Sequence, residues 1–170
     1  MRINGKPGFS ISAADRGLQY GDGLFETIAV TDGKPCLWAR HLQRLQTGCR
    51  RLGIQYPPPE QLLSECLEEI AGRERGVLKL LLTRGSGGRG YRPPAATEST
   101  CVVAFHSWPD YPPHCWRDGI RLRFCSTPLG ENPVLAGIKH LNRLEQVLAR
   151  AEWNVPEIAE GLMLDTGGRV

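Results

Sequence analysis

The sequence has 170 residues, 41% of them hydrophobic and 23% charged, which fits one globular domain or two small ones. Its 21 basic and 18 acidic residues are well mixed and leave a net charge of +3, so nucleic-acid binding has little support. A small anionic ligand would be enough to account for arginines that cluster locally. The chain start lacks the apolar core of a signal peptide and no apolar run reaches membrane-spanning length, so we expect a cytoplasmic protein.

The six cysteines are widely spaced and form no Cys-x-x-Cys pair. Zinc binding and thioredoxin-type chemistry therefore have no pattern to support them, and we expect no metal site. Most of these cysteines fall in predicted helices or strands, where a reduced thiol behaves as a small hydrophobic side chain.

The first part of the chain alternates short strands with two amphipathic helices, which predicts an N-terminal α/β domain over residues 1–107. The expected strands are Arg2–Asn4, Leu24–Thr31, Pro35–Leu37, Gly76–Thr83 and Thr100–His106. The expected helices are Trp38–Leu52, which ends at Gly53, and Glu60–Gly72. Pro7-Gly8 is expected as a turn, and Asp32-Gly33 as the turn of a hairpin.

Glycines cluster directly before the strand that begins at Leu24. Gly17, Gly21 and Gly23 predict a tight irregular loop, which either brings the backbone close to a ligand or is simply a structural turn. The spacing does not fit a dinucleotide-binding motif, because the glycines follow no predicted strand and open no helix.

Two segments rich in arginine are further candidates for an anion-binding site. Four arginines lie on the helix Trp38–Leu52, where a solvated basic face is the ordinary interpretation: Arg40, Arg44, Arg50 and Arg51. The segment Arg84–Pro94 combines three arginines, four glycines and Tyr91, which favours an anion-binding loop over a passive surface loop. Lys79 lies in the preceding strand and points away from its apolar neighbours, so we interpret it as a structural lysine.

Residues 108–118 contain several prolines and are predicted to connect two domains. Residues 119–170 then begin a second domain with expected strands at Gly119–Ser126 and Glu160–Leu164. A turn at Asp165–Gly168 is followed by only two residues of a new strand. We therefore expect the sequence to be the front part of a longer protein, with the remainder of this domain absent.

Lys139 lies between an apolar, glycine-containing approach and a predicted amphipathic helix. Leu141, Leu144, Val147 and Leu148 recur at helical spacing and predict one apolar face. A lysine near a helix N-terminus, or partly buried, is expected to have a lowered pKa and a free amine able to form a Schiff base. Taken alone, an ordinary surface lysine is the alternative.

Four separated segments then resemble one family. They are Arg16-Gly-x-x-Tyr20-Gly-Asp22-Gly-x-Phe25-Glu26-Thr27, His41-x-x-Arg44-Leu45, Arg84-Gly-Ser-Gly-Gly-Arg89-Gly-Tyr91 and Ala136-Gly-x-Lys139-His-Leu-Asn142-Arg143. In this order they resemble the fold-type IV pyridoxal 5′-phosphate enzymes, which include branched-chain and D-amino-acid aminotransferases and aminodeoxychorismate lyases. The last two segments are most similar to the lyases. The resemblance implies a mixed α/β (α+β) architecture, with a small N-terminal α/β domain and the first part of a larger, β-rich, cofactor-binding C-terminal domain.

The resemblance also implies roles for individual residues. Lys139 would be the Schiff-base lysine and proton carrier, and Arg44 would bind the cofactor phosphate, in place of a purely solvated role. Arg89 would bind a substrate carboxylate with Tyr91 beside it, and Arg84 or Arg92 would be a further candidate. Asn142 and Arg143 would line the cofactor. Phe25 stands where D-amino-acid aminotransferases carry a tyrosine, which weakens that alternative.

The function that the resemblance implies is conversion of 4-amino-4-deoxychorismate to 4-aminobenzoate and pyruvate, a step of folate biosynthesis, by a homodimer. An aminotransferase of the same fold is one alternative. An inactive fragment, or a module that binds anions or a partner chain, is another. The resemblance further implies that the glutamate pairing with the pyridine nitrogen and the turns completing the phosphate site lie beyond Val170. We therefore expect the 170-residue chain alone not to bind the cofactor normally.

Overall fold

The computed structural model describes residues 1–170, and its contacts divide the chain into two units. The first unit comprises Met1–Pro109 together with Ile138–Asn142, and the second comprises Asp110–Gly137 and Arg143–Val170. The short segment that carries Lys139 thus belongs with the N-terminal unit, although it lies within 119–170 in sequence. No helix is long and apolar enough to cross a membrane.

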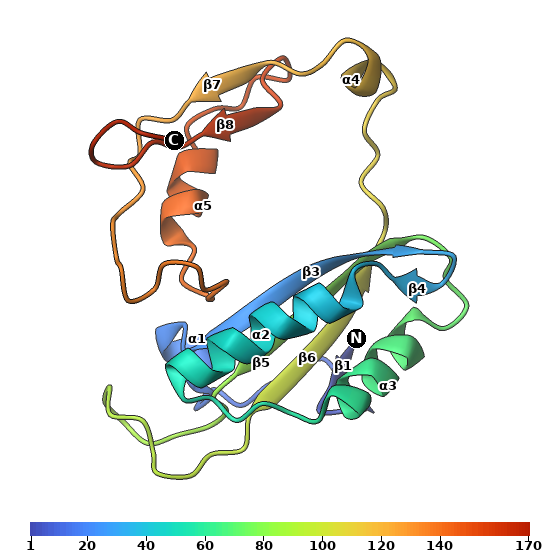
Figure 1. Ribbon diagram of the computed structural model, residues 1–170, viewed down its shortest axis with the longest axis vertical. Helices are drawn as coiled ribbons and strands as arrows, with labels where there is room; N and C mark the ends of the chain where they lie inside the picture. Colours follow the sequence, from blue (N-terminus) through green and yellow to red (C-terminus); the bar gives the residue numbers. More distant parts are fainter. The chain divides into compact units, whose positions relative to one another are not determined.

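A six-stranded antiparallel sheet with three helices forms the first unit (Figure 1). Its strand order is β2-β1-β6-β5-β3-β4. The strands are β1 (Arg2–Ile3), β2 (Lys6–Pro7), β3 (Gly23–Thr31), β4 (Lys34–Pro35), β5 (Gly76–Thr83) and β6 (Thr100–His106). The helices are α1 (Arg16–Tyr20), α2 (Trp38–Leu52) and α3 (Pro59–Ile70). The predicted bounds of α2, β5 and β6 are confirmed, because helical and alternating apolar patterns are clear in those segments.

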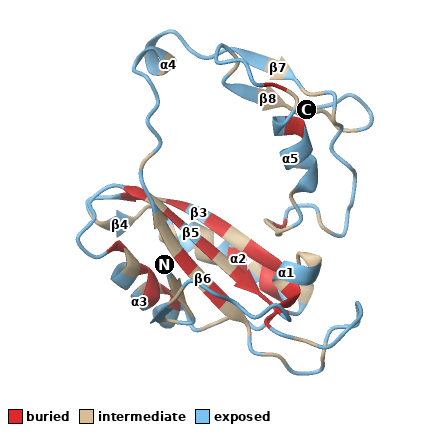
Figure 2. Cartoon of the chain, turned by 180° about the vertical axis from the view of Figure 1, so that it is seen from behind, coloured by how far each residue is buried: buried red, intermediate tan, exposed pale blue.

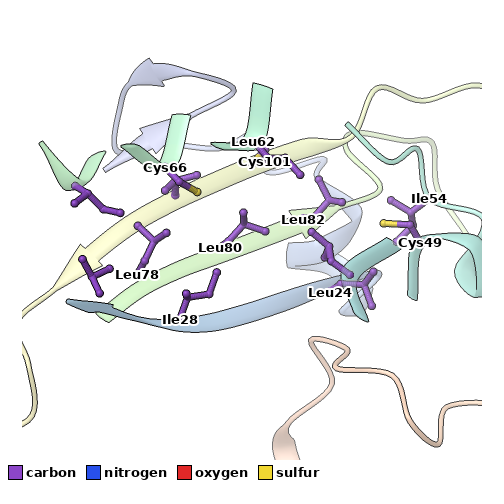
Figure 3. Packing of buried hydrophobic residues seen from close by; sticks show 14 of the residues in the cluster. Leu24, Ile28, Cys49, Ile54, Leu62, Cys66, Leu78, Leu80, Leu82 and Cys101 are labelled. Atoms are coloured by element: carbon purple, nitrogen blue, oxygen red, sulfur yellow. The ribbon is translucent and has the colours of Figure 1, made fainter. Parts of the chain in front are cut away.

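The core lies between one face of the sheet and the helices, with α2 against β3 and α3 against β6. Alternate residues of the central strands point into it, including Leu24 and Ile28 of β3 and Leu78 and Leu80 of β5 (Figure 3). Buried residues accordingly form bands along the central strands (Figure 2). Lys79 is exposed on the opposite face, as the alternation predicts.

Two local predictions in the first unit were wrong. The glycine-rich stretch before β3 contains the short helix α1, because the Asp15 carboxylate caps it by accepting a hydrogen bond from Gly17 N at 2.8 Å. Near the chain start, the turn lies at Asn4-Gly5, both with positive φ, and the residues around Pro7 return as β2.

The second unit contains α4 (His114–Arg117), β7 (Leu122–Phe124), α5 (Leu144–Arg150) and β8 (Glu160–Leu162). Strands β7 and β8 pair in parallel, and Trp153 and Ala149 are buried. Helix α5 begins at Leu144, so Leu141, which was predicted to lie on its apolar face, precedes the helix. The predicted inner face is also wrong for these residues, because Leu144, Val147 and Leu148 are exposed.

All six cysteines are free thiols. Cys49, Cys66 and Cys101 are buried in the core of the first unit, and the other three are partly exposed. Burial raises the pKa of Cys49 to about 12 and that of Cys66 to about 12.

These pKa values predict two classes of thiol reactivity. Near pH 8 only on the order of 10⁻⁴ of a thiol with pKa near 12 is thiolate, the form that reacts. With a disulfide reagent we expect the three partly exposed cysteines, Cys36, Cys115 and Cys125, to react in the folded protein. The three core cysteines should react only after unfolding in denaturant. Rapid reaction of all six in the folded protein would contradict the buried assignment.

Candidate active site

The segment that carries Lys139 lies along the edge of β3. Phe25 N donates to the Lys139 carbonyl at 3.0 Å, and Leu141 N donates to the Gly23 carbonyl at 3.0 Å. The edge is available because β4 pairs only with Val30 and Thr31, at the other end of the strand. The segment therefore satisfies backbone groups that β3 would otherwise leave unpaired.

Lys139 is held from both its backbone and its side chain by the same residue. Its Nζ lies 4.2 Å from the centroid of the Phe25 ring, a distance at which the ring face attracts an ammonium group. The predicted helix-terminus environment is wrong, because α5 begins five residues later, at Leu144, and a helix dipole acts only within about one turn. A strand edge, and not a helix end, positions this amine.

Glu26, the next residue of β3, makes a second polar cluster with α2. Its carboxylate accepts from Arg44 Nε at 2.8 Å, from a terminal nitrogen of Arg44, and from His41 Nδ1 at 2.7 Å. Glu26 is buried, whereas the Arg44 side chain is 47% exposed. The hydrogen bond to Glu26 raises the pKa of Arg44, outweighing desolvation. Glu26 therefore orients a half-exposed guanidinium whose remaining N–H groups can bind an anion.

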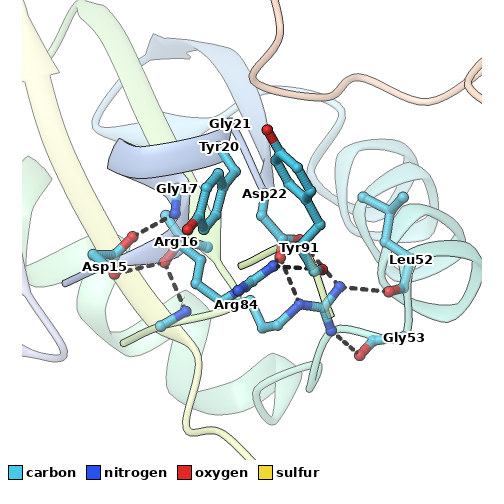
Figure 4. Close-up of polar contacts among 12 residues, drawn as sticks. Asp15, Arg16, Gly17, Tyr20, Gly21, Asp22, Leu52, Gly53, Arg84 and Tyr91 are labelled. Carbon is cyan, nitrogen blue, oxygen red and sulfur yellow. Dashed lines mark hydrogen bonds and ion pairs between the residues drawn. The ribbon is translucent and has the colours of Figure 1, made fainter. Parts of the chain in front are cut away.

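A third cluster links the start of α1 to the arginine-rich segment after β5 (Figure 4). The Asp22 carboxylate accepts from Arg16 Nε at 2.9 Å and from Arg84 at 2.7 and 3.0 Å. Arg84 also donates to the carbonyls of Leu52 and Gly53, at the C-terminal end of α2. Arg84 is buried and engaged in internal hydrogen bonds, which leaves it poorly suited to contact a substrate.

The two guanidinium groups of this third cluster share a single carboxylate, and their other hydrogen bonds go to backbone carbonyls. Burial raises the pKa of Asp22, but the hydrogen bonds from Arg84 and Arg16 outweigh it and hold that pKa below its ordinary value. One carboxylate faces two guanidinium groups, and backbone carbonyls accept the remaining donors. The carbonyls at the end of α2 also carry the negative end of the helix dipole, which favours a cation there.

Beyond Arg84, the segment reaches the solvent. Arg89 and Tyr91 are exposed, Tyr91 by 86%. Tyr91 makes an edge-to-face contact with Tyr20, with ring centroids 5.5 Å apart. Arg89 and Tyr91 are therefore accessible to a ligand.

Asn142 and Arg143, which were predicted to line the cofactor, belong to different units of the structure. Asn142 belongs to the first unit and donates from Nδ2 to the Gly21 carbonyl at 3.1 Å. Arg143 belongs to the second unit, directly before α5, and desolvation lowers its pKa despite the attraction of Glu145.

Sequence reasoning gave no role to Glu26 or Asp22, although both were present in its motifs. For Glu26 a signal existed, because a lone acidic residue at a core-facing position of an apolar strand requires a buried partner. For Asp22 the pattern offered no such signal, since an acidic residue beside glycines is common in loops.

Comparison with known proteins identifies a family and relatives that this chain resembles in sequence. The family model described as amino-transferase class IV matches residues 23–170. Aminodeoxychorismate lyase of Vibrio harveyi is 34% identical over 99% of this chain and 62% of its own length.

Two solved structures are similar across nearly the whole chain. The 4-amino-4-deoxychorismate lyase of Pseudomonas aeruginosa is 52% identical, with a TM-score of 0.92 over 98% of this chain and 61% of that one. The branched-chain amino acid aminotransferase of Escherichia coli, at 23% identity, shows the fold alone, with a TM-score of 0.82 over 98% of this chain and 59% of that one. The predicted fold class is confirmed, and the chain spans less than two thirds of the length of each of these relatives.

The packing around Gly23 gives a test of the strand-edge pairing. A Cβ at this position would lie 2.7 Å from Leu141 Cδ1 and 2.7 Å from the Leu82 carbonyl oxygen. Because the Leu82 backbone cannot move aside, Gly23→Ala should displace the segment beside Lys139 and destabilise the protein by about 1–3 kcal/mol. Urea unfolding measures the loss, and faster hydrogen exchange of the Phe25 and Leu141 amides locates it.

Gly8→Ala is the matched control for this substitution. The nearest atom to its new Cβ would be 3.6 Å away, at ordinary contact distance. It should leave both stability and the exchange of the two amides unchanged. Equal behaviour of the two variants would show that the Lys139 segment does not depend on Gly23.

Proposed function

The chain belongs to the class IV aminotransferase family, and from that premise we propose that the protein is a pyridoxal phosphate-dependent lyase. Its proposed substrate is 4-amino-4-deoxychorismate, and its products are 4-aminobenzoate and pyruvate. The observation that carries the proposal is the position of the Lys139 amine over the Phe25 ring. The similarity to two aminodeoxychorismate lyases supports this choice of substrate.

Members of the family use pyridoxal phosphate, and the residues of this chain fit that group. Arg44 offers a guanidinium that is oriented on one side by Glu26 and half-exposed on the other, as binding of a phosphate requires. Lys139 offers the amine that would bond the cofactor aldehyde. Phe25 and Glu26, which hold these two cations, are consecutive residues at the open edge of β3.

The cofactor, when bound, supplies the electron sink that the reaction needs. Lys139 Nζ would remove the proton from the ring carbon that bears the substrate amine and later return a proton to the departing three-carbon fragment. Arg89 would bind a substrate carboxylate, since its exposed guanidinium can form charged hydrogen bonds. Tyr91 would lie beside that carboxylate. Arg84 is left out of this assignment because its donors are used inside the protein.

The second candidate is an aminotransferase of the same fold, which would use the same lysine and phosphate-binding arginine. Phe25 favours the lyase over a D-amino-acid aminotransferase, because its ring contacts Lys139 without offering a hydroxyl group. Supplying an amino-acid donor and a keto-acid acceptor to the holoenzyme separates the two, since only an aminotransferase would exchange the amino group.

We also propose that the protein is a cytoplasmic homodimer that contributes to folate biosynthesis. Several large apolar side chains of the first unit are exposed, including Phe9 at 86%, Leu18 at 63% and Leu37 at 65%. Exposed apolar side chains of this size are consistent with a subunit interface. Sedimentation of the complete protein tests the oligomeric state.

Replacement of Lys139 tests the proposed function directly. In the complete protein loaded with cofactor, Lys139→Ala should lower turnover to 4-aminobenzoate and pyruvate by at least about 10²–10⁴-fold, as for loss of a positioned acid–base group. The visible absorbance of the bonded cofactor should also disappear. Lys79→Ala, which removes an exposed lysine of β5, is the control and should retain both. Normal turnover in Lys139→Ala would overturn the assignment.

Replacement of Arg44 tests the phosphate site separately. Arg44→Ala should weaken binding of pyridoxal phosphate about 10- to 100-fold, as expected for loss of charged hydrogen bonds. Binding of pyridoxal, which lacks the phosphate, should change much less. Arg40→Ala removes an exposed arginine of the same helix and should affect neither ligand. Equal losses for both ligands in Arg44→Ala would argue for a general structural role.

A further inference from the structure

Arg16 has no role in the proposed function, yet it is one of the most buried charged residues of the chain, at 2% exposure. We propose that Arg16 is a positioning residue, which fixes the backbone of Gly90 and Tyr91 and so directs Arg89 and Tyr91 towards a carboxylate substrate. The identity of that substrate rests on the proposed function. The restraint on the backbone does not, and it can be measured independently.

The contacts of Arg16 reach far along the sequence. Its two terminal nitrogens donate to the carbonyls of Gly90, at 3.0 Å, and Tyr91, at 3.1 Å, across 74 and 75 residues. Its main-chain N–H donates to the carbonyl of Gly85, in the same segment, at 2.9 Å. A planar guanidinium that holds two successive carbonyls fixes the direction of the peptide between them.

Tyr20, one turn later in α1, contacts the backbone N–H of Gly90, the residue whose carbonyl Arg16 holds. Its hydroxyl accepts a hydrogen bond from Gly90 N at 3.2 Å, so both backbone groups of Gly90 are engaged. The Arg16 guanidinium lies 4.8 Å from the centroid of the Tyr20 ring, and that ring contacts Tyr91 in turn (Figure 4). Gly90 has a φ of +91°, a conformation that strongly favours glycine.

The restraint is anchored in the core of the first unit. Arg16 Nε donates to the Asp22 carboxylate, which also accepts from Arg84. Arg84 in turn donates to carbonyls at the end of α2. Arg89 and Tyr91 flank the held peptide and are themselves exposed. Fixing that peptide lowers the conformational entropy that substrate binding must otherwise remove.

Arg16→Lys in the complete, cofactor-loaded protein tests the proposal. Lysine keeps the positive charge but cannot reach Asp22 and both carbonyls together. We expect the KM for 4-amino-4-deoxychorismate to rise about 5- to 50-fold, with a smaller change in kcat. We also expect faster trypsin cleavage between Arg89 and Gly90, followed by mass spectrometry without substrate. This bond reports on the held peptide because Arg92 precedes Pro93 and the side chain of Arg84 is buried.

Arg73→Lys is the matched control. Arg73 makes the same three kinds of contact in another part of the first unit: to the Glu69 carbonyl, to the Glu69 carboxylate and to the Phe105 ring. It should change neither KM nor cleavage after Arg89. Should Arg16→Lys fail to fold, Tyr20→Phe carries the test, because it removes only the hydroxyl that accepts from Gly90. It should shift both readouts in the same direction by less.

A double variant separates positioning from direct substrate contact. If Arg16 acts through Arg89 and Tyr91, Arg16→Lys combined with Arg89→Ala should raise KM by less than the two single effects on KM together. Additive increases in KM, or wild-type KM and cleavage in Arg16→Lys, would overturn the proposal. If the wild-type protein has no lyase activity, the proposed function fails. Faster cleavage after Arg89 in Arg16→Lys, but not in Arg73→Lys, would then still support the restraint on the backbone.

Discussion

Backbone pairing along the free edge of β3 brings Lys139, far later in the chain, next to Phe25. The geometry of the candidate site depends on this edge, because the same stretch of strand also presents Glu26 to α2. Pairing requires an open edge, and β4 leaves one by ending its contact at Val30. It also requires a residue without a side chain at Gly23, where the incoming segment lies closest.

The first unit contains two clusters in which one carboxylate accepts hydrogen bonds from two basic side chains. The buried carboxylate of Glu26 faces His41 and Arg44. The partly buried carboxylate of Asp22 faces Arg16 and Arg84. A buried carboxylate without such partners would be costly. The first cluster leaves the Arg44 side chain half-exposed, whereas the arginines of the second cluster hydrogen-bond to backbone carbonyls. Two arginine clusters of similar composition thus differ in how far their guanidinium groups are exposed to solvent.

Part of this arrangement was predictable. Helix α2 and strands β5 and β6 were predicted with the observed bounds, because their apolar residues recur at helical or alternating spacing. The short helix α1 was missed, since five residues are too few for periodicity and its cap at Asp15 resembles an ordinary turn residue. The apolar face predicted after Lys139 is largely exposed, because spacing identifies a face but not what covers it.

The sequence by itself determined the strands and main helices of the first unit, and its motifs identified the family and singled out Lys139, Arg44 and Arg89. Only the tertiary structure decided how these residues are held. In the structure, Lys139 lies beside the edge of β3 and not at a helix end. Arg44 is paired with the buried carboxylate of Glu26, and Arg84 is buried and paired with Asp22. The physical reason is that periodicity arises from local geometry, whereas edge pairing and ion pairs join residues that are distant in sequence.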